Sequence, residues 1–102
     1  MMKSFGDMMK QAQKVQKQMG ELQDKLAEER YEGSAGGGVV KVVVDGKQML
    51  KELKISPKAL EDGDVTLIED LVLTAVGEAQ RTSSEKMAEA YAKLTGGFKL
   101  PF

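Results

Sequence analysis

The apolar positions in the first third of the chain predict one long amphipathic helix, from about Ser4 to Arg30. Apolar residues recur there at alternating spacings of three and four, which is the heptad pattern of a coiled-coil seam. The segment contains no proline, and Ser4 followed by Asp7 resembles a capping box. We expect the seam to serve dimerisation or helix packing; its positions are Phe5, Met8, Ala12, Val15, Met19, Leu22 and Leu26.

The length of this helix indicates a partner. A helix of about 27 residues is roughly 40 Å long, whereas a compact domain of about 100 residues has a radius of gyration near 13 Å. The rest of the chain cannot cover such a helix, so it should project from the body or pair with another chain. We therefore predict a homodimer. The pattern leaves open whether two first helices pair along their seams or splay, each packing on its own chain's second helix.

A β-rich block follows, in which β-branched residues and glycines replace the helix formers. Asp-Gly between two apolar runs favours a hairpin turn, and proline ends a strand because it cannot donate to the ladder. The predicted antiparallel elements are a strand at Tyr31–Ser34, a turn at Gly36–Gly38, a strand at Val39–Asp45, a two-residue turn at Asp45-Gly46, and a return strand at Lys47–Ile55 ended by Ser56-Pro57.

A second long helix is predicted from about Val65 to Leu94, with Thr66 and Glu69 as its capping pair. Its first half carries a broad apolar face that should pack on the sheet. The pattern fades near Arg81, so the second half should lean away. The fold class is therefore α+β in a single domain: a helical arm at about 4–30, a three-stranded antiparallel sheet at about 31–55, a helix at about 65–94 and an extended tail at 95–102.

The composition excludes most catalytic chemistry. The 102 residues include no Cys, His or Trp, so there is no disulfide framework, thiolate nucleophile, imidazole base or zinc-finger ligand set. We expect no enzyme, no cofactor, no metal site and no small-molecule substrate. No signal peptide or apolar run of membrane-spanning length is apparent, so we expect a cytoplasmic protein without a membrane partner.

Three motifs could suggest a ligand or catalytic site, and each has a plainer interpretation. Gly33–Gly38 lacks the Gly-Lys-Ser/Thr ending of a phosphate-binding loop and leads into a strand, which favours a turn. Ser83 and Lys86 have nucleophile–base spacing, but without companion motifs they are expected on a solvated helix face. The acids within 62–70 are expected to cap the second helix rather than to bind a cation.

The net charge of −1 conceals a polarised first helix. Lys3 to Met19 contains four lysines and one acid, whereas Gly20 to Glu29 contains four acids and one lysine. Basic arms can contact phosphates whatever the total charge. An adaptor that docks a protein partner through a coiled coil, without DNA, is the alternative. The candidate DNA-contact residues are Lys3, Lys10, Lys14 and Lys17, with Arg81, Lys86 and Lys93 as a second group.

The chain resembles the YbaB/EbfC family of small bacterial nucleoid-associated proteins over nearly its whole length. The resemblance implies a tweezer-like homodimer whose helical arms hold duplex DNA, a role in nucleoid organisation or transcription regulation, and no catalysis. The chain departs from the family's pattern at Gly77, where relatives commonly carry Asn, and in its shortened Thr95–Gly97 segment. The resemblance rests on Met9–Gln13 and the heptads after it, Gly33–Val42, Asp45-Gly46, Ile55–Pro57, Leu60–Asp62, Ile68–Val72 with Ala75 and Ala79, and Gly96–Phe102.

Overall fold

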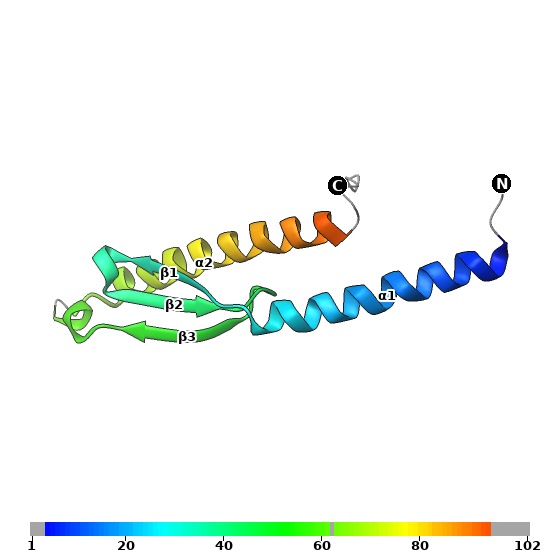
Figure 1. Ribbon diagram of the computed structural model, residues 1–102. Coiled ribbons are helices and arrows are strands. Elements are labelled where there is room, and N and C mark those ends of the chain that lie inside the picture. The colour runs from blue at the N-terminus through cyan, green and yellow to red at the C-terminus, as the bar shows by residue number, and fades with distance from the viewer. Residues whose placement is uncertain (1–3, 62, 95–102) are drawn as a thin grey trace.

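The computed structural model describes residues 4–61 and 63–94 and confirms the predicted order of helix, sheet and helix (Figure 1). The predicted tail at 95–102 lies outside the described residues. The elements are α1 (Phe5–Glu28), β1 (Tyr31–Ala35), β2 (Val40–Val44), β3 (Leu50–Ile55) and α2 (Val65–Leu94), with short 3-10 turns at Gly36–Gly38 and Pro57–Leu60.

The core lies between the sheet and one face of α2. The strands form an antiparallel sheet in the order β1-β2-β3, and α2 packs across β1 and β2. Alternate residues of β2 point toward α2 because side chains alternate along a strand. The buried cluster is small and consists of Val40, Val42, Val44, Ala75 and Ala79.

Gly33 brings the backbone of β1 against the backbone of α2. An ideal Cβ on Gly33 would lie 2.2 Å from the carbonyl oxygen of Ala75 and 2.8 Å from the amide nitrogen of Ala79. Both distances are shorter than any real Cβ contact, so no side chain fits at this position. The small residues of α2 and the glycine of β1 therefore together set how closely the helix approaches the sheet.

The arm predicted from the length of the first helix projects from the body, as Figure 1 shows. The radius of gyration is 19.7 Å and the longest extent is 71 Å, well above the value of about 13 Å for a compact domain of this size. Leu26 is buried at the base of α1 and Leu22 is half-buried. The seam positions farther out, including Phe5, are exposed.

The turn between β2 and β3 is longer than the predicted two-residue hairpin. The Asp45 carboxylate accepts hydrogen bonds from the backbone N–H groups of Lys47 and Met49, at 2.8 and 3.0 Å, so β3 begins only at Leu50. The residue with a left-handed backbone is Gln48, not Gly46. The two-residue turn was thus a wrong prediction, because the Asp45 side chain stabilises a wider loop.

Gly46 serves a different purpose, which is to let this turn meet the end of α1. Its N–H donates to the carbonyl oxygen of Leu26 at 2.8 Å. A Cβ at Gly46 would lie 2.5 Å from that same oxygen. The base of the arm is therefore hydrogen-bonded directly to the β2–β3 turn.

The same turn is tied to the middle of α2 by two side chains. The Ser83 hydroxyl donates to the carbonyl oxygen of Asp45 at 2.7 Å, and the Gln80 amide donates to the carbonyl oxygen of Gln48 at 3.2 Å. Ser83 is fully buried, so the expectation of a solvated position was wrong for it. Since its hydroxyl proton is engaged, Ser83 is a structural residue that links α2 to the turn.

The helix termini follow local capping rules, with one correction. The Ser4 hydroxyl accepts from the N–H of Asp7 at 3.2 Å, which confirms the predicted cap of α1. At α2 the carboxylate of Asp64 accepts from the N–H of Leu67 at 3.1 Å. The predicted Thr66 cap is wrong. Asp64 is the residue that caps α2, which begins at Val65, and Thr66 lies inside the helix.

Replacing Ser83 by alanine should lower the free energy of unfolding by about 1 kcal/mol, because a buried hydrogen bond is lost. Ser84→Ala is the matched control, since Ser84 is exposed on the same turn of α2 and should change stability little. Urea unfolding followed by circular dichroism measures both variants. Equal stability of the two variants would contradict the structural role of Ser83.

Candidate nucleic-acid interface

Lys10, Lys14 and Lys17 are exposed along the projecting part of α1. Lys10 and Lys17 are one heptad apart and lie on the face of the helix opposite the seam. Within the part of the chain that the structure describes, none of the three forms an ion pair. Lys3, the fourth predicted arm residue, lies outside the described residues. The three placed lysines thus form a positively charged face that no acid of the described residues neutralises in an ion pair.

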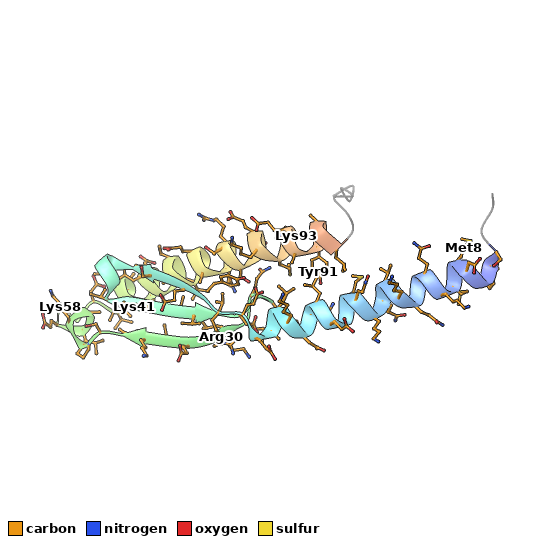
Figure 2. The ribbon with its side chains drawn as sticks, in the orientation of Figure 1. Met8, Arg30, Lys41, Lys58, Tyr91 and Lys93 are labelled. Carbon is orange, nitrogen blue, oxygen red and sulfur yellow. The ribbon has the colours of Figure 1, made fainter. Side chains whose placement is uncertain are left out.

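A second group of charges surrounds a hollow of about 550 Å³ between the base of α1 and the end of α2. Lys86 and Lys93 of α2, two of the second group of candidate DNA contacts, line it, and Figure 2 shows Lys93 near the end of that helix. Lys25 of α1 also lines it. Sequence analysis missed Lys25 because it lies in the acidic half of α1, although its heptad position flanks the seam and could have indicated it.

Acidic groups share this hollow with the lysines. The ammonium of Lys86 lies 3.7 Å from a carboxylate oxygen of Glu89, and the Tyr31 hydroxyl donates to the Glu29 carboxylate. That hydrogen bond is the main cause that raises the pKa of Tyr31 to about 12, with smaller contributions from burial and from the charges of Glu29 and Glu89. The hollow is therefore of mixed charge, which favours phosphate less than the arm does.

Arg81, the remaining member of the predicted second group, does not join Lys86 and Lys93 at the hollow. It is exposed on α2 and is two residues from the buried Ser83, so it lies on the opposite side of the helix. The structure thus brings together two of the three predicted α2 residues.

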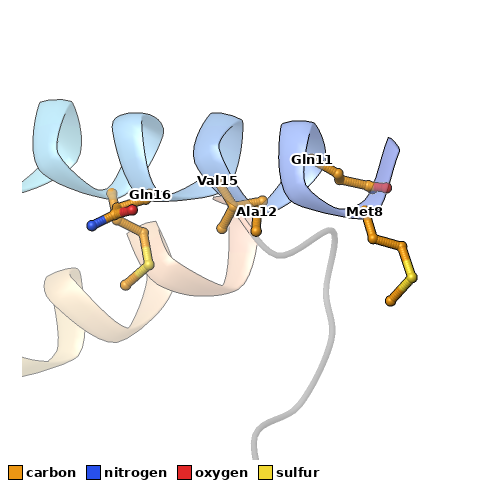
Figure 3. Close-up of a pocket in the computed structure, with 6 residues that line it drawn as sticks. Met8, Gln11, Ala12, Val15 and Gln16 are labelled. Carbon is orange, nitrogen blue, oxygen red and sulfur yellow. The ribbon is translucent and has the colours of Figure 1, made fainter. Parts of the chain in front are cut away.

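The seam on the outer half of α1 forms a shallow apolar surface instead of a packed interface. Met8, Ala12 and Val15 lie along one side of the helix, as Figure 3 shows. Together with Met19 they line a hollow of about 530 Å³. The arm therefore presents a basic face and an apolar face on opposite sides.

Two further observations concern the described residues. No helix in residues 4–61 and 63–94 is long and apolar enough to cross a bilayer. Over the same ranges, no three His, Cys, Asp or Glu side chains gather as a metal ion would require.

The sequence of the chain matches a known protein family and several of its members. Residues 2–98 match the model of the YbaB/EbfC DNA-binding family. A nucleoid-associated protein of Moorella thermoacetica is 47% identical over 100 residues, which cover 98% of this chain and 96% of that protein. Another from Desulforamulus reducens is 47% identical over 98 residues, which cover 96% and 93%.

A solved structure shares the fold. The crystal structure of an uncharacterized protein from Helicobacter pylori matches with a TM-score of 0.84 at 19% identity, and the match covers 92% of this chain and 99% of that one. The family is defined by DNA binding, which agrees with the expectation that the chain is not an enzyme. From its sequence match and its fold, we conclude that the chain belongs to the YbaB/EbfC DNA-binding family.

Proposed function

We propose that the protein binds duplex DNA as a homodimer and that the exposed lysines of α1 contact the phosphates. The observation that carries this proposal is the projecting arm, on which Lys10, Lys14 and Lys17 are exposed and free of ion pairs among the described residues. Lys3, which the heptad pattern of the sequence groups with Lys10 and Lys17, belongs to the same proposal. Arg81, Lys86 and Lys93 are the weaker candidates, because two of them share a hollow with acids.

Contacts of this kind position a protein on DNA without reading its sequence. Lysine is a point charge with three donors and recognises phosphate oxygens by charge, whereas sequence is read by side chains that reach base edges. We therefore expect binding with modest sequence preference. This mode of binding suits a protein that acts on nucleoid organisation or on gene expression over many sites. The names of the relatives support association with the nucleoid.

In a homodimer, two copies of the arm would contact DNA. Two arms double the number of phosphates that are neutralised, and affinity rises with that number. The exposed seam residues of α1, Phe5, Met8, Ala12, Val15 and Met19 with Leu22 and Leu26 at its base, remain candidates for contact between arms or between an arm and its own α2. An adaptor that docks a protein through this seam is the alternative function.

A gel-shift experiment with random-sequence duplex DNA separates the two functions. A phosphate-binding protein should shift the duplex at low salt, because the counterions released on binding drive association there. A protein adaptor should give no shift at any salt concentration. Absence of a shift at low salt would overturn the proposal.

A further inference from the structure

The apolar seam of α1 loses its cover at the point where α2 ends. Leu26 is 1% exposed, and Leu22 is half-buried and lines the same hollow as Leu94, the last residue of α2. Farther out the exposed fraction rises, from 38% at Met19 to 59% at Met8. The described residues thus cover the base of the seam and leave the rest bare. We call this bare part the outer seam; it consists of Phe5, Met8, Ala12, Val15 and Met19.

The chain leaves α2 in the direction of the outer seam. The two helices run in opposite directions, so the end of α2 points along α1 toward the far end of the arm, as Figure 1 shows. Leu94 and Leu22 line one hollow, and Met19 is the next seam position beyond Leu22. The residues that follow α2 therefore start beside the inner end of the outer seam.

The sequence that follows α2 has the pattern of a strand with one apolar side. Phe98, Leu100 and Phe102 alternate with Lys99 and Pro101, so in an extended chain the three apolar side chains share one side. Proline does not continue a helix, and it biases the residue before it toward an extended backbone. We call residues 95–102 the tail segment. Its sequence favours an extended conformation with an apolar edge.

We propose that the tail segment lies along the outer seam of its own arm, with the Phe98 ring in the notch at Ala12. The inference goes beyond the proposed function, because it concerns the apolar face of the arm and not the basic face that would contact DNA. Ala12 is the smallest side chain of the outer seam and lies between Met8 and Val15 (Figure 3). The hollow of about 530 Å³ that these residues line therefore has room for a phenyl ring at this point.

The reach of the tail segment agrees with this placement. An extended chain advances about 3.3 Å per residue, whereas a helix rises about 1.5 Å per residue. Phe98 is the fourth residue after α2, so it reaches roughly 13 Å along the arm, the length of about nine helical residues. That distance leads from Leu22 to the neighbourhood of Ala12. By the same measure Phe102 reaches the level of Phe5.

A segment of the same chain has an advantage over any separate partner. A short tether gives it an effective concentration in the millimolar range, whereas a separate molecule loses its translational and rotational freedom on binding. The charges agree as well. Neutral side chains, Gln11 and Gln16, flank the hollow, and Lys99 falls on the side of the extended segment that faces away from the seam. Docking would therefore bury apolar groups without burying a charge.

Phe98→Trp tests the contact, because the chain has no tryptophan of its own. Ala12→Asp places a carboxylate in the notch and should release the segment. We expect acrylamide to quench the indole of Phe98→Trp at least about threefold less efficiently than that of the Ala12→Asp, Phe98→Trp double variant, since a packed indole is shielded from solvent.

Gln13→Asp combined with Phe98→Trp is the matched control for this measurement. It introduces the same carboxylate one residue away, at an exposed position outside the seam, and should leave the indole shielded. Equal quenching in all three variants would overturn the placement of Phe98 at Ala12.

A cross-link in the full-length protein identifies which arm the tail segment occupies, because the chain has no cysteine. Gln11→Cys combined with Lys99→Cys leaves Phe98 and Ala12 intact. A short bismaleimide should join the two sites within one chain and give a product of the chain mass, 11.1 kDa, plus one linker. Gln13→Cys with Lys99→Cys is the control, since Gln11 lines the hollow and Gln13 lies on the other side of Ala12.

The first pair should react at least about fivefold faster than the control pair, because docking raises the local concentration of one site near the other. Equal rates would overturn the docking. A product at twice the chain mass would show that a second chain occupies the seam, which would also overturn it. The gel shift of the wild type is independent of both experiments, so failure of the docking and failure of DNA binding are distinguishable.

Discussion

Gly33→Ala is expected to lower the free energy of unfolding by about 3 kcal/mol. The added Cβ would lie 2.2 Å from the backbone oxygen of Ala75, and backbone atoms cannot swing aside as a flexible side chain can. Relief requires α2 to move away from β1, which would open the only buried cluster that the described residues contain. Overpacking of cores typically costs 1–3 kcal/mol, and a backbone clash belongs at the upper end.

Gly77→Ala is the matched control, because Gly77 lies in α2, the helix that Gly33 approaches, and a Cβ there would meet nothing within 4 Å. Alanine favours an exposed helix position over glycine by about 1 kcal/mol, so this variant should be more stable than the wild type. Urea unfolding followed by circular dichroism compares the two. If Gly33→Ala were as stable as the wild type, the close approach of β1 to α2 would be wrong.

Lys10→Glu combined with Lys17→Glu should weaken DNA binding at least about 100-fold at low salt. Each substitution removes a positive charge from the arm and adds a negative one, and in a homodimer four positions change. Repulsion from the phosphates then replaces attraction. Because both residues are exposed on the face of α1 opposite the seam, the chain should remain folded and dimeric by circular dichroism and ultracentrifugation.

Lys41→Glu combined with Lys58→Glu controls for the change in net charge, which is equal for the two pairs. Lys41 and Lys58 lie at the end of the molecule opposite the arm, as Figure 2 shows. This pair should reduce affinity only slightly, since exposed charges separated by more than about 10 Å are largely screened at 0.1 M salt. Equal losses for both pairs would mean that the arm is not the contact site.

The elements of the fold could be predicted from the sequence because local patterns determine them. The heptad spacing predicted α1, and the length of that helix relative to a compact domain predicted the projecting arm. Runs of β-branched residues predicted the strands. Glycine-rich and proline-containing segments marked the turns. These features depend on residues within one or two turns of each other, which is the range over which periodicity and capping act.

What could not be predicted depends on contacts between distant residues. Ser83 lies in a polar stretch that suggests solvent, yet it is buried because its hydroxyl meets the Asp45 carbonyl oxygen, 38 residues away in sequence. Gly46 stands in an Asp-Gly pair that is typical of a two-residue hairpin turn. In the structure its N–H instead donates to the Leu26 carbonyl oxygen. The same distinction applies to the candidate site. The arm lysines could be chosen as candidates from the heptad pattern of one helix, whereas Lys25 and Lys86 line one hollow only because the fold brings α1 and α2 together.

The salt dependence of duplex binding by the wild-type protein tests the central claim most directly. Fluorescence anisotropy with a labelled random-sequence duplex, repeated between about 50 and 200 mM salt, gives the slope of log affinity against log salt concentration. Each neutralised phosphate contributes about −0.9 to that slope. We predict a straight line with a slope steeper than about −3, which becomes shallower in the Lys10→Glu, Lys17→Glu variant. A flat line, or no binding at 50 mM salt, would contradict a protein that holds DNA through its basic arms.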